Sequence, residues 1–479
     1  MNRRVTAEYN YLFGSNPDAE PADVSWAESI AHLLRDFPLS CWSTIAVPQY
    51  LRVSSAVSGL NSINAMALPF LLKDAYHITP AGLSIITVAA AGPSFIKPFF
   101  ALLADNYPIS GLRRKPYLII ANCVEILAKV GFGVAANLGA PLPVIITFLV
   151  INSSSSALDA TIRDTLMIEV SARNPTDGPA LIADVAGLSV VSALSVSYFS
   201  GALLGFVTPG TLVASSAIFS AVNLYLSSRM FEDADAPRAP PLRIENLART
   251  FSQSGGVLKS QASAVAVWSC VPSFHDAMFF YYTQKLHLHS EFFGRVRFLG
   301  NCAMLVANAA YRAIFKNFDQ RTLSMTASGL TIPLMATVAI LTTGHTESWL
   351  QMSPTTYIMV KHCLHDGLYT LASISNMVML SKVAPRGSEG PFFAVYGNIN
   401  DFGTLTNGAV SAVALHAYGI TATNFDNLTK LIYTSAVMGA VSAPWSLWTP
   451  ESVPQLVEPE EVHEEEELLL LNSTPELVH

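Results

Sequence analysis

Four side chains able to carry charge or protons interrupt an apolar stretch near residue 360. Lys361, His362, His365 and Asp366 are spaced so that, on a helix, Lys361 lies over His365 and His362 over Asp366. Three roles are open: pairing with a cargo carboxylate and relaying protons, forming an internally satisfied polar cluster, or binding a metal. Metal binding is disfavoured because no other histidine cluster has ligand spacing. We therefore predict no metal and no cofactor.

Two other apolar stretches carry similar groups. Asp159 and Arg163 are one helical turn apart, with Asp164 beside them, so cargo contact and structural pairing are equally open. His275 and Asp276 lie among aromatic residues. Such rings can clamp a flat heterocycle while a polar group holds its edge, although they could also form an interfacial belt.

The composition places all these groups inside a membrane protein. Of 479 residues, 51% are hydrophobic and 13% are charged, and the mean hydropathy is +0.39. A soluble core cannot bury so many apolar residues, so the surplus faces lipid. Charges within lipid-spanning helices cost roughly 3 kcal/mol or more each, so they face a cavity or a partner. For Glu125 and Lys129, four residues apart, we predict an internal ion pair without cargo contact.

Twelve stretches are long and apolar enough to cross a bilayer as helices. The predicted fold class is therefore an all-α, polytopic membrane protein with twelve transmembrane helices in two six-helix halves. The predicted helices span roughly 50–72, 81–104, 116–137, 143–168, 180–206, 210–230, 260–283, 292–314, 323–343, 353–381, 391–417 and 429–449. The predicted divisions are a cytoplasmic segment with an amphipathic helix (1–49), the two halves (50–230 and 260–449), a linker (231–259) and an acidic disordered tail (450–479).

Lysine and arginine concentrate in the loops on one side, which predicts that both termini are cytoplasmic. On that side, Asp105, Arg113 and Arg114 surround a tight turn and could form either a gate that breaks and reforms or a basic anchor. On the other side, Asn427 begins a plausible N-glycosylation sequon. The net charge of −8 arises from the tail, and no basic aromatic surface supports nucleic-acid binding.

Three motifs resemble the folate-biopterin transporter family, a branch of the major facilitator superfamily. They are Ala67–Asp74, the run from Lys97-Pro98 through Asp105 to Arg113-Arg114-Lys115-Pro116-Tyr117, and Ala384–Gly390 followed by Phe392-Phe393-Ala394. The resemblance implies two six-helix halves, a central cavity, and a pteridine or folate as cargo. The family tends to carry two acids four residues apart in the fourth helix, whereas Asp159 and Asp164 are five apart. Another charged heterocycle, such as S-adenosylmethionine, therefore remains an alternative cargo.

The sequence as a whole predicts a secondary transporter that alternates access between two halves. The hypothesis includes coupling to protons as one option. A membrane enzyme and a non-transporting scaffold are weaker alternatives. The acidic tail resembles a dileucine sorting signal for an adaptor, which favours the plasma membrane or an endosomal or lysosomal membrane. A disordered tail without a role is an equally open interpretation. The predicted cargo-binding residues are Asp159, Arg163, Asp164, His275, Asp276, Lys361, His362 and Asp366, and the predicted gating residues are Asp105, Arg113 and Arg114.

Overall fold

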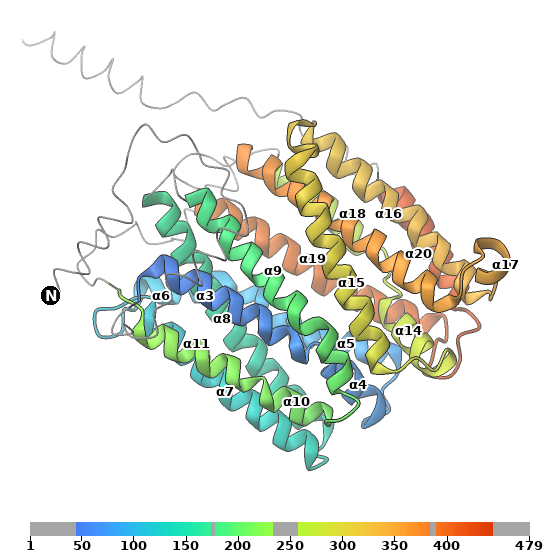
Figure 1. Ribbon diagram of the computed structural model, residues 1–479, viewed down its shortest axis with the longest axis horizontal. Helices are drawn as coiled ribbons and strands as arrows, with labels where there is room; N and C mark the ends of the chain where they lie inside the picture. Colours follow the sequence, from blue (N-terminus) through green and yellow to red (C-terminus); the bar gives the residue numbers. More distant parts are fainter. Residues whose placement is uncertain (1–44, 174–177, 233–256, 384–388, 444–479) are drawn as a thin grey trace, which may run out of the picture.

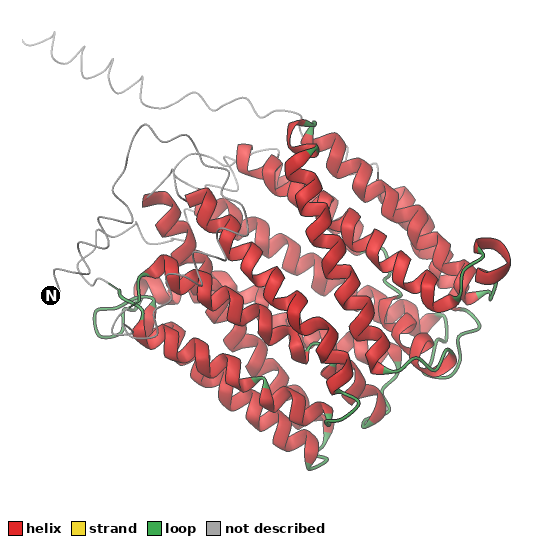
Figure 2. Ribbon diagram, in the orientation of Figure 1, coloured by secondary structure: helices red, strands yellow, loops and turns green. Residues whose placement is uncertain are grey.

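The computed structural model describes residues 45–173, 178–232, 257–383 and 389–443. These residues form helices and short connections, without a β-strand in the described ranges (Figure 2). The predicted amphipathic helix of the N-terminal segment, nearly all of the linker and the acidic tail lie outside the described residues.

The first half runs from blue to green in Figure 1 and forms six successive helical rods. Several rods consist of consecutive shorter helices. Its elements are α3 (Val47–Leu60), η1 (Asn61–Asn64), α4 (Ala67–Asp74), α5 (Pro80–Ala91), η2 (Gly92–Ile96), α6 (Lys97–Asn106), α7 (Lys115–Asn137), α8 (Leu142–Arg173), α9 (Gly178–Leu203), α10 (Pro209–Ser215) and α11 (Ala217–Arg229).

The second half, yellow to red, lies beside the first (Figure 1). Its elements are α13 (Val257–Ser269), α14 (His275–Phe280), η3 (Tyr281–Lys285), α15 (Ser290–Ala313), η4 (Phe315–Asn317), α16 (Gln320–Thr342), α17 (Thr346–Leu350), α18 (Pro354–Val383), α19 (Glu389–Ala417) and α20 (Leu428–Ser442).

Seven helical segments among the described residues are long and apolar enough to cross a membrane, including all six rods of the first half and α16. The other predicted crossings correspond to α13 with α14, and to α15, α18, α19 and α20. These segments are more polar, interrupted, or described over a shorter length. The helical membrane fold is thus confirmed, while the full set of twelve crossings stays a prediction.

Some helices predicted as continuous are interrupted. The predicted helix 260–283 breaks between Ser269 and His275, where Pro272 lacks the N–H that a helix interior needs. Likewise, the predicted helix 81–104 passes through the 3₁₀ segment η2, which contains Pro93. Hydropathy alone does not reveal such breaks, because the apolar residues continue through them.

Equivalent turns in the two halves have the same backbone geometry. His77 and His287 both adopt the left-handed conformation, with φ of 50° and 51°. In each turn the next N–H returns to a carbonyl six residues earlier, from Ile78 to Leu72 at 3.1 Å and from Leu288 to Tyr282 at 3.0 Å. This recurrence is what a repeated helical unit produces.

Across the boundary between the halves, α5 packs against α19 and α14, and α9 packs against α15 (Figure 1). The contact of α9 with α15 requires glycine, because a Cβ on Gly201 would lie 2.8 Å from the Cα of Gly294. At the predicted outer end, Phe70 of the first half packs edge-on against Phe279 and Phe293 of the second, with ring centroids 5.2 and 5.6 Å apart. This aromatic cluster seals the halves together at that end.

Candidate functional site

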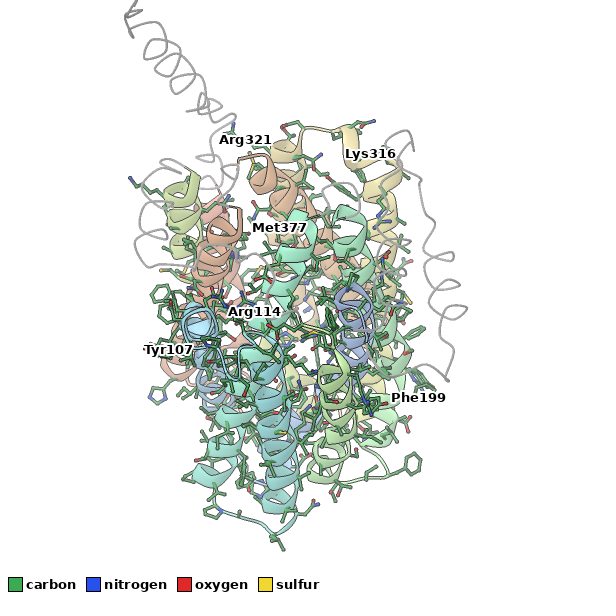
Figure 3. The ribbon with its side chains drawn as sticks, turned by 90° about the vertical axis from the view of Figure 1, so that its left-hand side faces the viewer. Tyr107, Arg114, Phe199, Lys316, Arg321 and Met377 are labelled. Carbon is green, nitrogen blue, oxygen red and sulfur yellow. The ribbon has the colours of Figure 1, made fainter. Side chains whose placement is uncertain are left out.

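Arg114 lies inside the bundle at its predicted cytoplasmic end, whereas Tyr107 lies on the outer surface (Figure 3). Its guanidinium is 2.7 Å from Asp105 Oδ1 and 2.7 Å from Glu169 Oε1, so it links the end of α6 to α8. Burial alone would lower the pKa of Arg114, but the charges of Glu169 and Asp105 outweigh burial and raise it. Asp105 and Arg114, two of the predicted gating residues, are therefore paired with each other, and Glu169 extends the pair.

Arg113, which was predicted as a gating residue, takes part in this region through its backbone N–H. The Glu232 carboxylate accepts the N–H groups of Arg113, Arg114 and Lys115 at 2.8, 2.8 and 2.7 Å. A carboxylate there satisfies unpaired donors at the start of α7 and complements the positive end of its dipole. The sequence did not reveal this cap, because Glu232 lies more than a hundred residues further along the chain.

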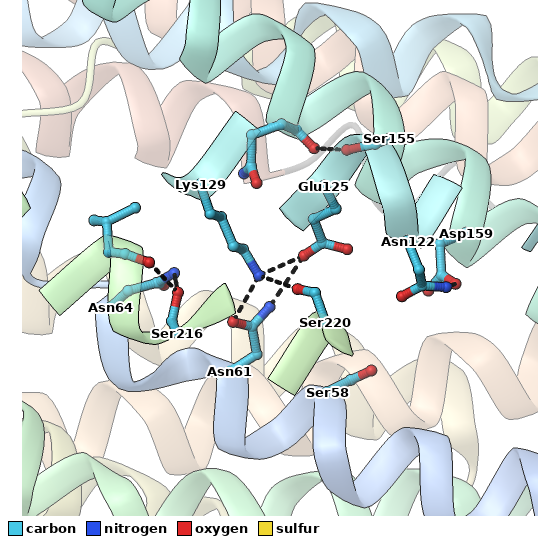
Figure 4. Close-up of polar contacts among 12 residues, drawn as sticks. Ser58, Asn61, Asn64, Asn122, Glu125, Lys129, Ser155, Asp159, Ser216 and Ser220 are labelled. Atoms are coloured by element: carbon cyan, nitrogen blue, oxygen red, sulfur yellow. Dashed lines mark hydrogen bonds and ion pairs between the residues drawn. The ribbon is translucent and has the colours of Figure 1, made fainter. Parts of the chain in front are cut away.

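A buried polar network stabilises the interior of the first half (Figure 4). Lys129 Nζ lies 2.5 Å from Glu125 and donates to Asn61 at 2.9 Å and to Ser220 at 2.7 Å. The side chains of Lys129 and Glu125 are 2% and 7% exposed. The predicted internal ion pair is present, and every donor of the ammonium has an acceptor.

The predicted pair on α8 is also formed. Arg163 Nε lies 2.8 Å from Asp159 Oδ2, while Arg163 donates to Ser58 at 2.8 Å and Asp159 accepts from Asn122 at 3.0 Å. Asp164, the adjacent residue, has a different environment. It is exposed, and the charges acting on it come from Arg163, Lys97 and Asp159.

The second half brings together groups from α14 and α18 that the sequence singled out separately. His275 lies within electrostatic reach of Lys361 and Asp366, and His362 Nδ1 lies 2.8 Å from the carbonyl oxygen of Ile358. His365 Nδ1 lies 3.2 Å from Asp366 Oδ1. The described residues contain no group of three or more His, Cys, Asp or Glu that could hold a metal ion.

Lys361 and Arg297, two cations on helices of the second half, have no hydrogen bond or ion pair with any described residue. Lys361 feels the charge of Asp366 but does not pair with it. Arg297 on α15, which the sequence analysis did not single out, is also without a carboxylate partner in the described part of the chain. An unpaired cation within a helix bundle is costly unless water or an incoming anion reaches it.

Exposure distinguishes two of the predicted site residues. Asp164 on α8 of the first half and His275 at the start of α14 of the second are both exposed. Their side chains are therefore accessible to a molecule outside the protein.

Three polar contacts between described residues cross from one half to the other. Lys97 at the start of α6 lies 3.1 Å from Asp401 on α19, and Ser84 on α5 donates to Asp276 on α14. Asn301 on α15 donates to Ser197 on α9 at 2.7 Å. The sequence analysis proposed Asp276 as a cargo contact and used Lys97 only as part of a motif. Lys97 and Asp401 could have been singled out from the sequence, because each is a charged residue in a predicted membrane helix. Nothing in the sequence indicated that the two residues form a pair.

Comparison with solved structures shows which fold the chain has. The chain has the fold of the major facilitator transporters, with a TM-score of 0.63 to the nucleoside transporter NupG at 11% identity, covering 84% of this chain and all of that one. The D-xylose–proton symporter gives a TM-score of 0.61 at 12% identity, covering 85% of this chain and 98% of that one.

Sequence comparison shows the family to which the chain belongs. The chain belongs to the BT1 family, whose profile matches residues 58–467. Its similar relatives include the folate-biopterin transporter of Synechocystis, 24% identical with 84% of this chain and 81% of that protein covered. Folate transporter 2 of Plasmodium falciparum is also 24% identical, with 78% and 82% covered.

Proposed function

We propose that this protein is a secondary transporter, not an enzyme, that carries a pteridine or folate across a membrane by alternating access. The names of its relatives support this cargo class. The observation that carries the proposal is that Lys361 has no partner among the described residues, although the charge of Asp366 acts on it and His275 lies within its electrostatic reach. An empty transport site needs polar groups that are not already satisfied by the protein.

In this proposal, Lys361 pairs with a carboxylate of the cargo. The attraction between ammonium and carboxylate is stronger there than in bulk water, because protein surrounds much of Lys361. His275, His362 and Asp366 lie close enough to hold polar edges of the cargo or to exchange a proton with it. Asp159, Arg163 and Asp164 form the facing wall, and Asp164 is the member of that group open to water.

Alternation between open states requires cross-half contacts that can break. The pair formed by Lys97 and Asp401 is partly exposed and joins two rigid halves, so it can separate as they rock. When it breaks, Asp164 of the same half offers Lys97 another carboxylate, since the charge of Lys97 already reaches it. Arg114, held by Asp105 and Glu169, serves as the cytoplasmic latch of the first half.

Uptake of labelled folate and biopterin into transport-deficient cells tests the function. We expect accumulation above that of cells with an empty vector, with competition between the two compounds because they share a site. A protonophore should reduce accumulation if a proton is the coupling ion. Absence of accumulation, with the protein at the cell surface, would show that the cargo assignment is wrong.

We further propose that the protein resides in the plasma membrane and cycles through endosomes by means of the dileucine-like tail, which lies outside the described residues. Changing Leu468 and Leu469 to Ala should shift the protein towards the surface in microscopy.

The Asn427 amide donates to the Tyr418 carbonyl at 3.0 Å, so a glycan there must replace that contact. Glycosidase treatment of the wild type and of Asn427→Gln shows whether the site is used.

A further inference from the structure

Two aromatic side chains on α18 stand parallel, one helical turn apart. The rings of His365 and Tyr369 are inclined by only 6°, and their centroids are 6.4 Å apart. Both rings are accessible, since the His365 side chain is 39% exposed and Tyr369 is 62% exposed. Neither the predicted site nor the proposed mechanism above uses Tyr369.

The pair belongs to the face of α18 that is turned towards α13 and α19. Asn376, two helical turns beyond Tyr369 on that face, donates to Tyr396 Oη of α19 at 2.8 Å and is 3.4 Å from Gln261 Nε2 of α13. Tyr369 also lies near enough to Tyr396 to act on it electrostatically. An accessible ring on this face is therefore turned towards neighbouring helices of the second half.

The opposite side of α18 is occupied by protein and lipid. It packs against α15 and α16, and Tyr357 there is hydrogen-bonded to Thr337 of α16 at 2.8 Å. The exposed apolar residues Val360 and Leu364 lie on the outward side, away from the turn that carries His365 and Tyr369. Exposure of the two rings is thus not the ordinary exposure of a lipid-facing surface.

Asp366 contacts His365 from the side of α15. Its Oδ1 lies 3.2 Å from His365 Nδ1, and its Oδ2 lies against Gly300 of α15. The contact with Asp366 favours one orientation of the His365 ring, which reduces the entropic cost of ligand binding.

We infer that His365 and Tyr369 form a stacking platform for the flat, nitrogen-rich bicyclic ring of the cargo. The inference rests on the proposed function and assigns its ring-recognition residues. Lys361 lies eight residues from Tyr369, or about 12 Å along the helix, so a cargo with a ring at one end and a carboxylate at the other can engage both. Stacking is tolerant of ring substituents, since any flat heterocycle presents a π face.

Biopterin isolates the ring contact, because it carries the pteridine ring without a glutamate carboxylate. We would measure its competition with labelled folate for purified, full-length protein, comparing Tyr369→Leu, Tyr369→Phe, His365→Leu and His365→Phe. Loss of either ring should weaken biopterin about tenfold. The Phe variants should stay within about threefold of the wild type, because they keep a ring at each position.

Tyr433→Leu is the matched control, because Tyr433 is an exposed tyrosine on another helix, 53% accessible, and should bind biopterin as the wild type does. Equal thermal stability of the variants excludes misfolding as the cause of weaker binding. If the wild type binds biopterin and Tyr369→Leu binds it equally well, the platform is wrong and the proposed function stands. If the wild type binds neither folate nor biopterin, both are wrong.

Discussion

The two halves share a fold but treat their charges differently. In the first half, Lys129 pairs with Glu125, Arg163 with Asp159, and Arg114 with two acids. In the second half, Lys361 and Arg297 have no carboxylate partner among the described residues. Similar helices thus carry paired charges in the first half and some unpaired charges in the second.

The difference separates charges that hold the structure from charges that wait for a partner. A buried pair contributes little net stability, but removal of one member leaves an uncompensated charge and costs about 3–5 kcal/mol. An unpaired cation already bears that cost, so its removal relieves the protein. Charge removal should therefore have opposite effects on stability in the two halves.

The largest effect should come from Lys361→Met, which removes the unpaired cation and keeps the length of the side chain. We expect uptake of labelled folate to fall about 100-fold, since loss of one partner of a desolvated charge pair costs roughly 2–5 kcal/mol. Lys316→Met, at an exposed position at the end of the bundle, is the matched control and should transport normally. Full activity of Lys361→Met would mean that the cargo does not use this cation.

Lys129→Met should instead destabilise the protein by about 3–5 kcal/mol, because Glu125 loses its buried partner. The measurement is the free energy of unfolding in detergent. Adding Glu125→Gln should restore much of the loss, because the second change removes the orphaned charge. If the double variant is as unstable as Lys129→Met, the pair does not act as a unit.

Asp401→Asn should have a moderate effect, about fivefold to tenfold on uptake, because it weakens a partly exposed contact between the halves. Exchange of the two charges, Lys97→Asp with Asp401→Lys, should recover part of the activity of Lys97→Asp alone. Absence of any recovery would indicate that Lys97 acts through a group other than Asp401. Glu347→Gln, a change of an exposed acid at the other end, controls for net charge.

The smallest effect should come from Asp319, which caps α16 by accepting the N–H of Thr322 at 2.9 Å. The Thr322 hydroxyl and N–H lower the pKa of Asp319. Its contribution to stability is therefore present at neutral pH and is lost as the pH falls through that lowered pKa. Asp319→Ala should decrease the Tm by about 2 °C at pH 7. The decrease should become smaller in acid, and a decrease independent of pH would contradict the cap.

The sequence predicted the helices, and the pairs within one helix, better than it predicted the contacts between helices. Apolar length located the helices, and helical spacing predicted the pairs Glu125–Lys129 and Asp159–Arg163, because both members lie on one helix. Contacts between helices, such as that of Ser84 with Asp276 and that of Glu232 with the start of α7, depend on packing. No local spacing encodes them.

The same limit applies to the polar groups of α14 and α18. The sequence indicated that polar groups on α14 and α18 lie inside the bundle, and the structure brings His275 within reach of Lys361. Which of those groups remain unpaired depends on every neighbouring helix. The parallel arrangement of His365 and Tyr369 depends in addition on the rotamers that packing imposes.

The most direct test of the central claim is the Tm of purified Lys361→Met and wild type, each with and without folate. Ligand at about 100 times its Kd stabilises a binding-competent protein by roughly 2.7 kcal/mol, so the wild type should melt at a higher temperature with folate. Lys361→Met should melt at or above the temperature of the wild type without ligand and should show no increase with folate. A variant that melts lower, or that folate stabilises as strongly as it does the wild type, would contradict the assignment of Lys361 to the cargo.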